Sequence, residues 1–125
     1  EWFFFPLGVF FKALGGIPVH RSKKMSLVDQ LAQVFKERDF FHLAITPEAT
    51  RKHNSKWKKG FYFIAKGAEV PIILIGLDYG TKTVYVGKEL IPSGDVDKDM
   101  LIVNDFFKDF KGKNPKNFLL NKEDE

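Results

Sequence analysis

A short segment near the middle of the chain holds the side chains best suited to chemistry. An apolar run, residues 40–45, ends just before Pro47 and is followed by Glu48, Thr50 and Arg51. An apolar run that ends in proline is typical of a buried strand that opens into a loop. Loops at the carboxyl ends of strands bind ligands in open α/β folds. A carboxylate, a hydroxyl and a guanidinium placed so closely suit an anionic substrate that also carries hydroxyls.

A basic cluster follows this segment. Lys56, Lys58 and Lys59 surround Trp57. Such a cluster attracts anionic lipid head groups, with the tryptophan at the interface, although a solvated start of a helix would have the same pattern. The net charge of +4 fits a phosphate-bearing partner, a membrane surface or nucleic acid without choosing among them. Because no nucleic-acid-binding motif accompanies the charge, we expect no nucleic-acid partner.

The elements around this segment predict an α/β fold with a mostly parallel central sheet flanked by helices, because apolar strands alternate with helical patterns. The run at 70–77 is continuously apolar, so we expect a strand covered on both faces. No linker divides the chain, which predicts a single domain over residues 1–125. The predicted strands are 17–20, 40–45, 70–77 and 83–86, and the predicted helices are 2–14, 26–38, 56–66 and 96–110.

The first residues predict that the domain is truncated at its N-terminus. The chain begins with Glu1, not Met, and runs directly into the aromatic segment 2–11. That segment is shorter than the roughly 20 apolar residues needed to span a bilayer, and it lacks the basic region that begins a signal peptide. We interpret the sequence as a fragment whose upstream part is missing.

The histidines and cysteines predict no metal site. The chain has no cysteine, and His20, His42 and His53 are too scattered to read as ligands of one ion. His20 adjoins a candidate site residue and could act as an acid or base, because an unperturbed histidine titrates near neutrality. His42 lies within the apolar run, so we expect it to be a core histidine. His53 lies in a polar loop, so we expect it to be solvated.

Three segments occur in an order and spacing that carry a resemblance. Residues 15–21, which run from Gly15 to Arg21, look like a Gly-x5-Arg block; residues 47–51 look like a Glu-Gly-Thr-Arg block; and residues 70–73 look like an apolar strand with proline. Together they resemble the glycerolipid acyltransferases of the 1-acylglycerol-3-phosphate acyltransferase type, over roughly residues 2 to 92. The His-x4-Asp block of that family is absent here and is expected upstream of Glu1.

The resemblance implies transfer of an acyl group from acyl-CoA or acyl carrier protein to a hydroxyl of a lysophosphatidate-like lipid, in phospholipid synthesis, at the cytoplasmic face of a membrane. Arg21 and Arg51 would hold the phosphate. Glu48 would accept from the hydroxyl or hold Arg51 in place, and Thr50 would donate to the phosphate or cap the turn. The family's histidine would be the general base. No metal or tightly bound cofactor is implied, and this chain alone is expected to be inactive.

Two positions depart from the family pattern. Ala49 stands where the family has glycine, and His20 stands where an acidic residue is common. The added methyl group at Ala49 changes a tight backbone site, and His20 changes the charge beside the proposed phosphate site. These departures keep an alternative open, namely a non-catalytic or degenerate module that binds anionic membrane surfaces.

Overall fold

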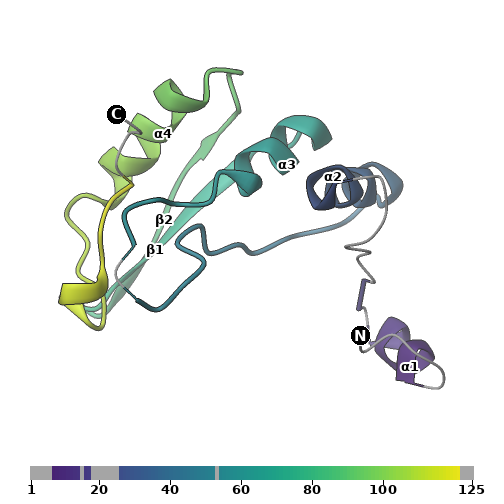
Figure 1. Cartoon of the computed structure of the whole chain (residues 1–125), viewed down its shortest axis with the longest axis horizontal. Coiled ribbons are helices and arrows are strands. Elements are labelled where there is room, and N and C mark those ends of the chain that lie inside the picture. The colour runs from purple at the N-terminus through teal and green to yellow at the C-terminus, as the bar shows by residue number, and fades with distance from the viewer. Residues whose placement is uncertain (1–6, 15, 18–25, 53, 122–125) are drawn as a thin grey trace.

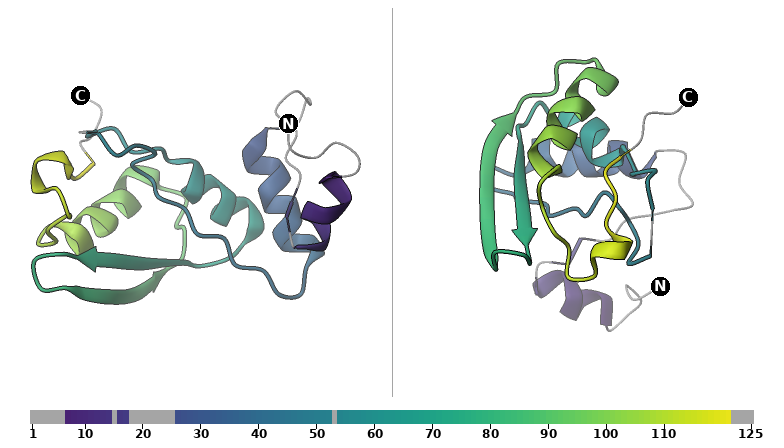
Figure 2. Two further views of the ribbon diagram at one scale, coloured as in Figure 1. Left: turned by 90° about the horizontal axis from the view of Figure 1, so that it is seen from below. Right: turned by 90° about the vertical axis from the view of Figure 1, so that its left-hand side faces the viewer.

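The computed structural model describes residues 7–14, 16–17, 26–52 and 54–121. Helices α2 and α3 pack against each other, and α3 and α4 lie on the same side of a β-hairpin (Figure 1 and Figure 2). The elements in chain order are α1 (Leu7–Ala13), α2 (Leu27–Glu37), α3 (Gly60–Ala68), β1 (Ile72–Asp78), β2 (Thr83–Leu90), α4 (Val96–Phe107) and the 3-10 turn η1 (Pro115–Asn117).

The prediction of a mostly parallel central sheet is wrong. In the described part of the chain the sheet has two strands, β1 and β2, paired antiparallel with Ile75 opposite Val86. The turn at residues 79–82 joins them directly, and a parallel pair would need a crossover of a dozen or more residues. The prediction of a strand at 40–45 is also wrong, since these residues have no strand assignment and no described strand pairs with them. An apolar run does not identify a pairing partner.

The prediction that β1 is covered on both faces is also wrong. Residues alternate along β1 between buried and exposed. The face toward α4 buries Leu74, whereas Ile75 on the opposite face is 55% exposed and its partner Val86 is 71% exposed. Helices α3 and α4 lie on one side of the hairpin (Figure 2). A continuously apolar run therefore predicted the strand correctly but not the number of its buried faces.

The helix ends follow local capping chemistry. Ser26 caps α2 as predicted, because its hydroxyl accepts from the Asp29 N–H at 3.2 Å. Asp95 caps α4 in the same way, accepting from the Lys98 N–H at 3.1 Å. Helix α3 begins at Gly60 rather than at residue 56 and ends in the left-handed Glu69. Residues 56–59 therefore belong to the loop that precedes α3.

The core joins segments that are distant in sequence. Its buried residues come from the loop before α3, from both strands and from α4, and are Trp57, Leu74, Leu90, Met100 and Val103. The Trp57 ring meets the Phe107 ring edge to face at 5.8 Å between centroids. The last part of the chain closes this core, since Phe118 packs against it. The loop with the candidate site chemistry is therefore anchored directly to the core.

Candidate functional site

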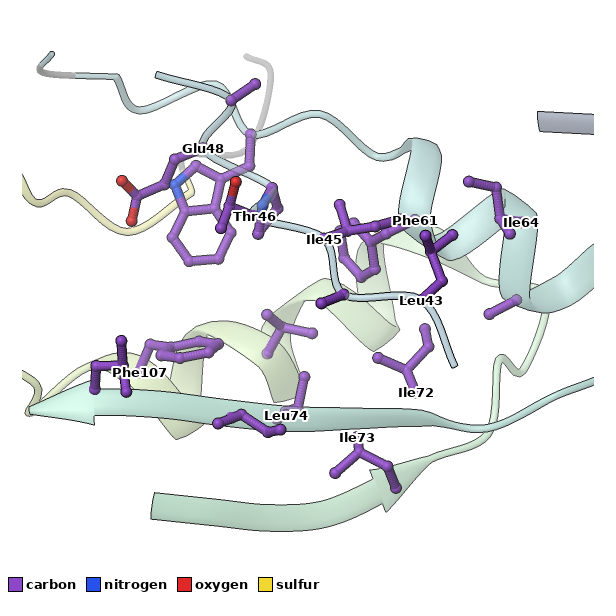
Figure 3. Close-up of a pocket in the computed structure, with 18 of the residues that line it drawn as sticks. Leu43, Ile45, Thr46, Glu48, Phe61, Ile64, Ile72, Ile73, Leu74 and Phe107 are labelled. Atoms are coloured by element: carbon purple, nitrogen blue, oxygen red, sulfur yellow. The ribbon is translucent and has the colours of Figure 1, made fainter. Parts of the chain in front are cut away.

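A cleft of about 1320 Å³ separates the extended segment 41–46 from β1. Leu43 and Ile45 lie on one wall, and Ile72 and Leu74 lie across from them on β1 (Figure 3). Phe61 from α3 adds to the apolar lining. A cleft of this size lined mainly by aliphatic and aromatic side chains suits a largely apolar ligand.

The polar end of the cleft is the loop that carries the predicted motif. Glu48, Thr50 and Arg51 all contribute to the lining. The chain turns sharply there, since the Ala49 N–H donates to the Thr46 carbonyl at 3.1 Å and Ala49 has a φ of 55°. Glycine adopts this left-handed conformation without the steric cost of a Cβ atom. The residue that departs from the family pattern therefore occupies a position where the backbone favours glycine.

The predicted alternatives for Thr50 can be compared with its contacts. Its hydroxyl oxygen accepts from the Lys52 N–H at 3.1 Å, which closes a short side-chain turn. The side chain is exposed, and the hydroxyl hydrogen remains able to donate to a ligand. Thr50 thus caps the turn, and this contact leaves its donor available.

Asn54 organises the rest of the loop. Its amide nitrogen donates to the Glu48 carbonyl at 2.9 Å and to the Lys56 carbonyl at 3.0 Å, and its amide oxygen accepts from the Lys56 N–H at 3.0 Å. The Lys58 N–H donates to the Pro47 carbonyl at 2.8 Å. One side chain therefore ties the start of the loop to its end. The sequence prediction missed Asn54, although asparagine is a common turn residue that bonds to nearby backbone groups.

The side chains of Glu48 and Arg51 do not form an ion pair with each other. Within the described part of the chain, no ion pair joins the two side chains. Burial raises the pKa of Glu48 above its ordinary value, because desolvation disfavours the charged carboxylate. Arg51 is exposed, and its guanidinium makes no hydrogen bond to another described residue. Both groups are therefore available to a ligand at the polar end of the cleft.

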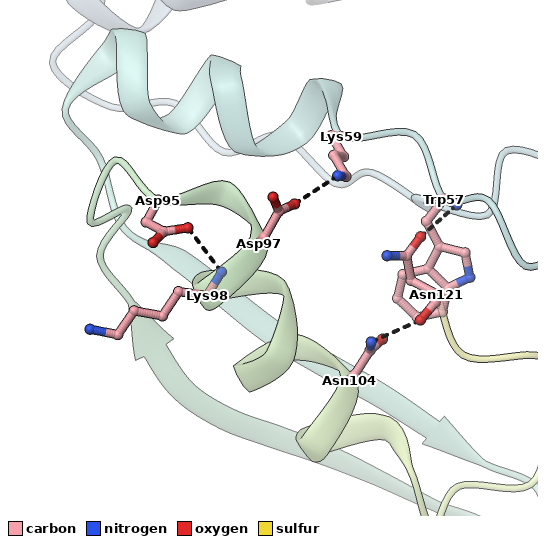
Figure 4. A network of polar contacts seen from close by, with 7 residues as sticks. All are labelled: Trp57, Lys59, Asp95, Asp97, Lys98, Asn104 and Asn121. Atoms are coloured by element: carbon pink, nitrogen blue, oxygen red, sulfur yellow. Dashed lines mark hydrogen bonds and ion pairs between the residues drawn. The ribbon is translucent and has the colours of Figure 1, made fainter. Parts of the chain in front are cut away.

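The predicted basic cluster is divided by the fold. Trp57 is 6% exposed, and its indole N–H donates to the Leu119 carbonyl at 3.1 Å, so it anchors the loop and does not reach the surface. Lys59 pairs with Asp97 at 3.0 Å (Figure 4). Lys56 and Lys58 are exposed. Arg51 and Lys52 of the motif loop are exposed as well.

The sequence comparisons decide the family. The Acyltransferase family model matches residues 2–77, which is more than half of the chain. The chain belongs to the acyltransferase family. No curated protein matches the chain, and no solved structure does. The matched residues include the motif loop of this acyltransferase chain and the segments on both sides of its cleft.

Some predicted site residues lie outside the part that the structure describes. Arg21 and His20 belong to residues 18–25, and His53 is a single gap in the loop. His42 is described, and the prediction of a core histidine is wrong: the residue is exposed and its ring meets the Phe40 ring edge to face at 4.7 Å. Position within an apolar run did not determine burial here, because the run has no neighbouring strand.

Residues 7–14, 16–17, 26–52 and 54–121 hold neither a metal-binding cluster nor a membrane-spanning helix. No group of three His, Asp or Glu side chains there could hold a metal ion. None of the helices in those ranges is both long enough and apolar enough to cross a bilayer.

Proposed function

We propose that the chain is the acceptor-binding part of an enzyme that acylates a lysophosphatidate-like lipid in phospholipid synthesis. One observation carries the proposal: a polar loop with Glu48, Thr50 and Arg51 lies at one end of a mainly apolar cleft. A lysophospholipid has the same division, with an anionic, hydroxyl-bearing head group and an apolar chain. Family membership supports acyl transfer as the reaction class.

In this proposal Arg51 binds the acceptor phosphate through two parallel N–H donors. Glu48 accepts a hydrogen bond from the acceptor head group, and Arg21 adds a second cation to the phosphate. The acceptor hydroxyl attacks the thioester carbon of acyl-CoA or acyl carrier protein. An ester C–O bond forms, the C–S bond breaks, and the thiol leaves with the proton that the hydroxyl loses.

The base for this proton would come from the His-x4-Asp block, which the resemblance implies upstream of Glu1. Positioning the hydroxyl against the thioester would supply much of the acceleration. We propose that the 125-residue chain binds acceptor but does not transfer acyl groups by itself. Acyl transfer by this chain at a rate comparable to that of a longer parent would contradict that part of the proposal.

We also propose that the protein acts as a peripheral protein at the cytoplasmic face of a membrane, where a lipid acceptor resides. The exposed lysines 56 and 58 support this placement, since cations near a surface favour anionic lipids. Trp57 takes no part in it because it is buried. The alternative, a non-catalytic module for anionic membranes, depends on the same lysines and needs no cleft.

The experiment is a titration of the full chain with glycerol 3-phosphate, comparing Arg51→Ala with Lys52→Ala as the matched control. We expect Arg51→Ala to weaken binding about tenfold or more, because charge-assisted bonds contribute roughly 1.5–3 kcal/mol. Lys52→Ala should change affinity by less than about threefold. Equal losses in both variants, accompanied by equal losses of binding to anionic vesicles, would favour the membrane-binding module instead.

A further inference from the structure

The last described segment of the chain returns to the motif loop. This segment, residues 114–121, is called the C-terminal strap below. Asn117, at the end of η1, donates from its side-chain amide to the Arg51 carbonyl at 3.1 Å. The two residues are 66 positions apart in the sequence. The strap therefore makes a direct contact with the backbone of the residue that we place on the acceptor phosphate.

The strap is itself firmly held. The Asn121 side chain accepts from the Trp57 N–H at 3.0 Å, and the Asn121 carbonyl accepts from the Asn104 side chain at 2.9 Å (Figure 4). Asn121 is buried, and Phe118 packs on the core. These contacts hold the strap against α4, the core and the loop that precedes α3.

The geometry of η1 presents Asn117 to the loop. The Asn117 N–H donates to the Asn114 carbonyl at 2.9 Å, and the Phe118 N–H donates to the Pro115 carbonyl at 3.3 Å. Pro115 fixes its own φ at the first position of the turn. The Asn117 side chain is thus carried by a closed turn, whereas the loop that it contacts has an exposed Thr50 and Arg51.

We propose that Asn117 is a positioning residue for Arg51. This inference rests on the proposed function, since it assumes that Arg51 binds the acceptor phosphate. Residue 117 lies beyond the family match, which ends at residue 77, so the positioning would come from a part of the chain that the family model does not include. Holding the Arg51 carbonyl in the free protein limits the conformations of the loop before the ligand arrives.

The expected effect on affinity depends on the fraction of molecules whose motif loop has the binding conformation. When only a fraction of molecules has the binding conformation, the apparent dissociation constant rises by the inverse of that fraction. Loss of the Asn117 bond should therefore weaken anion binding without altering the bound state. A residue with a merely structural role would instead change the bound state or the stability of the whole chain.

The test is an NMR titration of the full chain with glycerol 3-phosphate, following the Arg51 Nε–H resonance in Asn117→Ala. Asn114→Ala is the matched control, because it removes the same side chain three residues away and the Asn114 side chain makes no capping bond. We expect Asn117→Ala to raise the dissociation constant about three- to tenfold. The saturated chemical shift and the urea midpoint should match those of the wild type, and Asn114→Ala should bind normally.

The outcomes separate this inference from the function on which it depends. If Arg51→Ala abolishes binding while Asn117→Ala leaves it unchanged, the positioning role is wrong and the proposed function stands. An altered saturated shift, or an equal loss in Asn114→Ala, likewise overturns the positioning role. If the wild-type chain does not bind glycerol 3-phosphate, or binds it equally well as Arg51→Ala, the proposed function fails and the positioning role fails with it.

Discussion

Two polar regions of this acyltransferase chain differ in how their charged groups are satisfied. At the start of α4, the buried carboxylate of Asp99 accepts from the Tyr62 hydroxyl at 2.9 Å and from the Ser93 N–H and hydroxyl at 2.7 and 3.0 Å. In the motif loop, no described residue pairs with the side chains of Glu48 or Arg51. We call the Asp99 network the closed region, because its hydrogen bonds are made within the protein. We call the motif loop the open region, because its charged side chains lie at the end of a cleft.

The pKa values of the two carboxyl groups follow the same division. Burial acts to raise the pKa of Asp99, but the bonds from Ser93 and Tyr62 outweigh it, so the pKa lies below its ordinary value. Burial raises the pKa of Glu48, and no compensating bond is present. A fully bonded carboxylate contributes to the fold, whereas an uncompensated one at a cleft is a candidate for ligand contact.

The largest effect should come from breaking the closed region. Replacing Asp99 with alanine leaves Tyr62 and Ser93 without their buried acceptor, so we expect the free energy of unfolding to fall by roughly 3 kcal/mol. Urea denaturation measures this change. Affinity for glycerol 3-phosphate, measured where the variant is still folded, should stay within about twofold of the wild type.

Asp97→Ala provides the matched control for that comparison. Asp97 lies two residues earlier in α4, and its carboxylate pairs with Lys59 at the surface. An exposed ion pair contributes about 0.2–1 kcal/mol, so the loss of stability should be much smaller. Equal losses in the two variants would mean that the buried network has no special role in stability.

A smaller effect of opposite sign is expected in the open region. Ala49→Gly should raise the free energy of unfolding by about 0.5–1 kcal/mol, because glycine accepts the positive φ of this position without steric cost. The methyl group of Ala49 is exposed, so its removal costs little packing. Thermal or urea unfolding measures the gain.

Ala44→Gly is the control for backbone conformation. Ala44 is exposed in the extended segment and has no positive φ. Glycine there should lower stability, because it adds freedom to the unfolded chain without relieving strain in the folded one. A gain in both variants would show that the loop tolerates alanine at position 49 without strain.

The sequence predicted local features of the backbone better than it predicted which strands pair with each other. Ser26 was predicted correctly as a helix cap, and the predicted strand at 70–77 overlaps β1, whereas the predicted strand at 40–45 does not form. The parallel sheet was wrong because strand partners depend on contacts between distant segments. An apolar run carries no information about which edge it will occupy or whether a second layer will cover it.

The candidate site was predicted in part. Glu48, Thr50 and Arg51 were identified from their types and spacing, and the structure places all three at the cleft. Asn117 could not be found in this way, because its contact with Arg51 depends on the return of a segment 66 residues later. Trp57 was assigned to a membrane interface from its lysine neighbours, whereas the indole is held by the C-terminal strap.

The smallest predicted effect tests the charge state of the open region. Burial raises the folded-state pKa of Glu48 above its unfolded-state pKa. The contribution of Glu48 to the free energy of unfolding is therefore fully present below the unfolded-state pKa, and it is lost as the pH rises through the folded-state pKa. Glu48→Gln removes the charge and should therefore stabilise the chain at neutral pH. The gain should be only about 0.5 kcal/mol, because the side chain is partly solvated, and it should disappear at a pH below about 4. Urea midpoints at several pH values measure this gain in stability.

Glu89→Gln is the control for net charge. Glu89 is exposed on strand β2, so the substitution removes one negative charge without relieving burial. The same pH-dependent gain in that variant would attribute the effect to net charge rather than to the cleft.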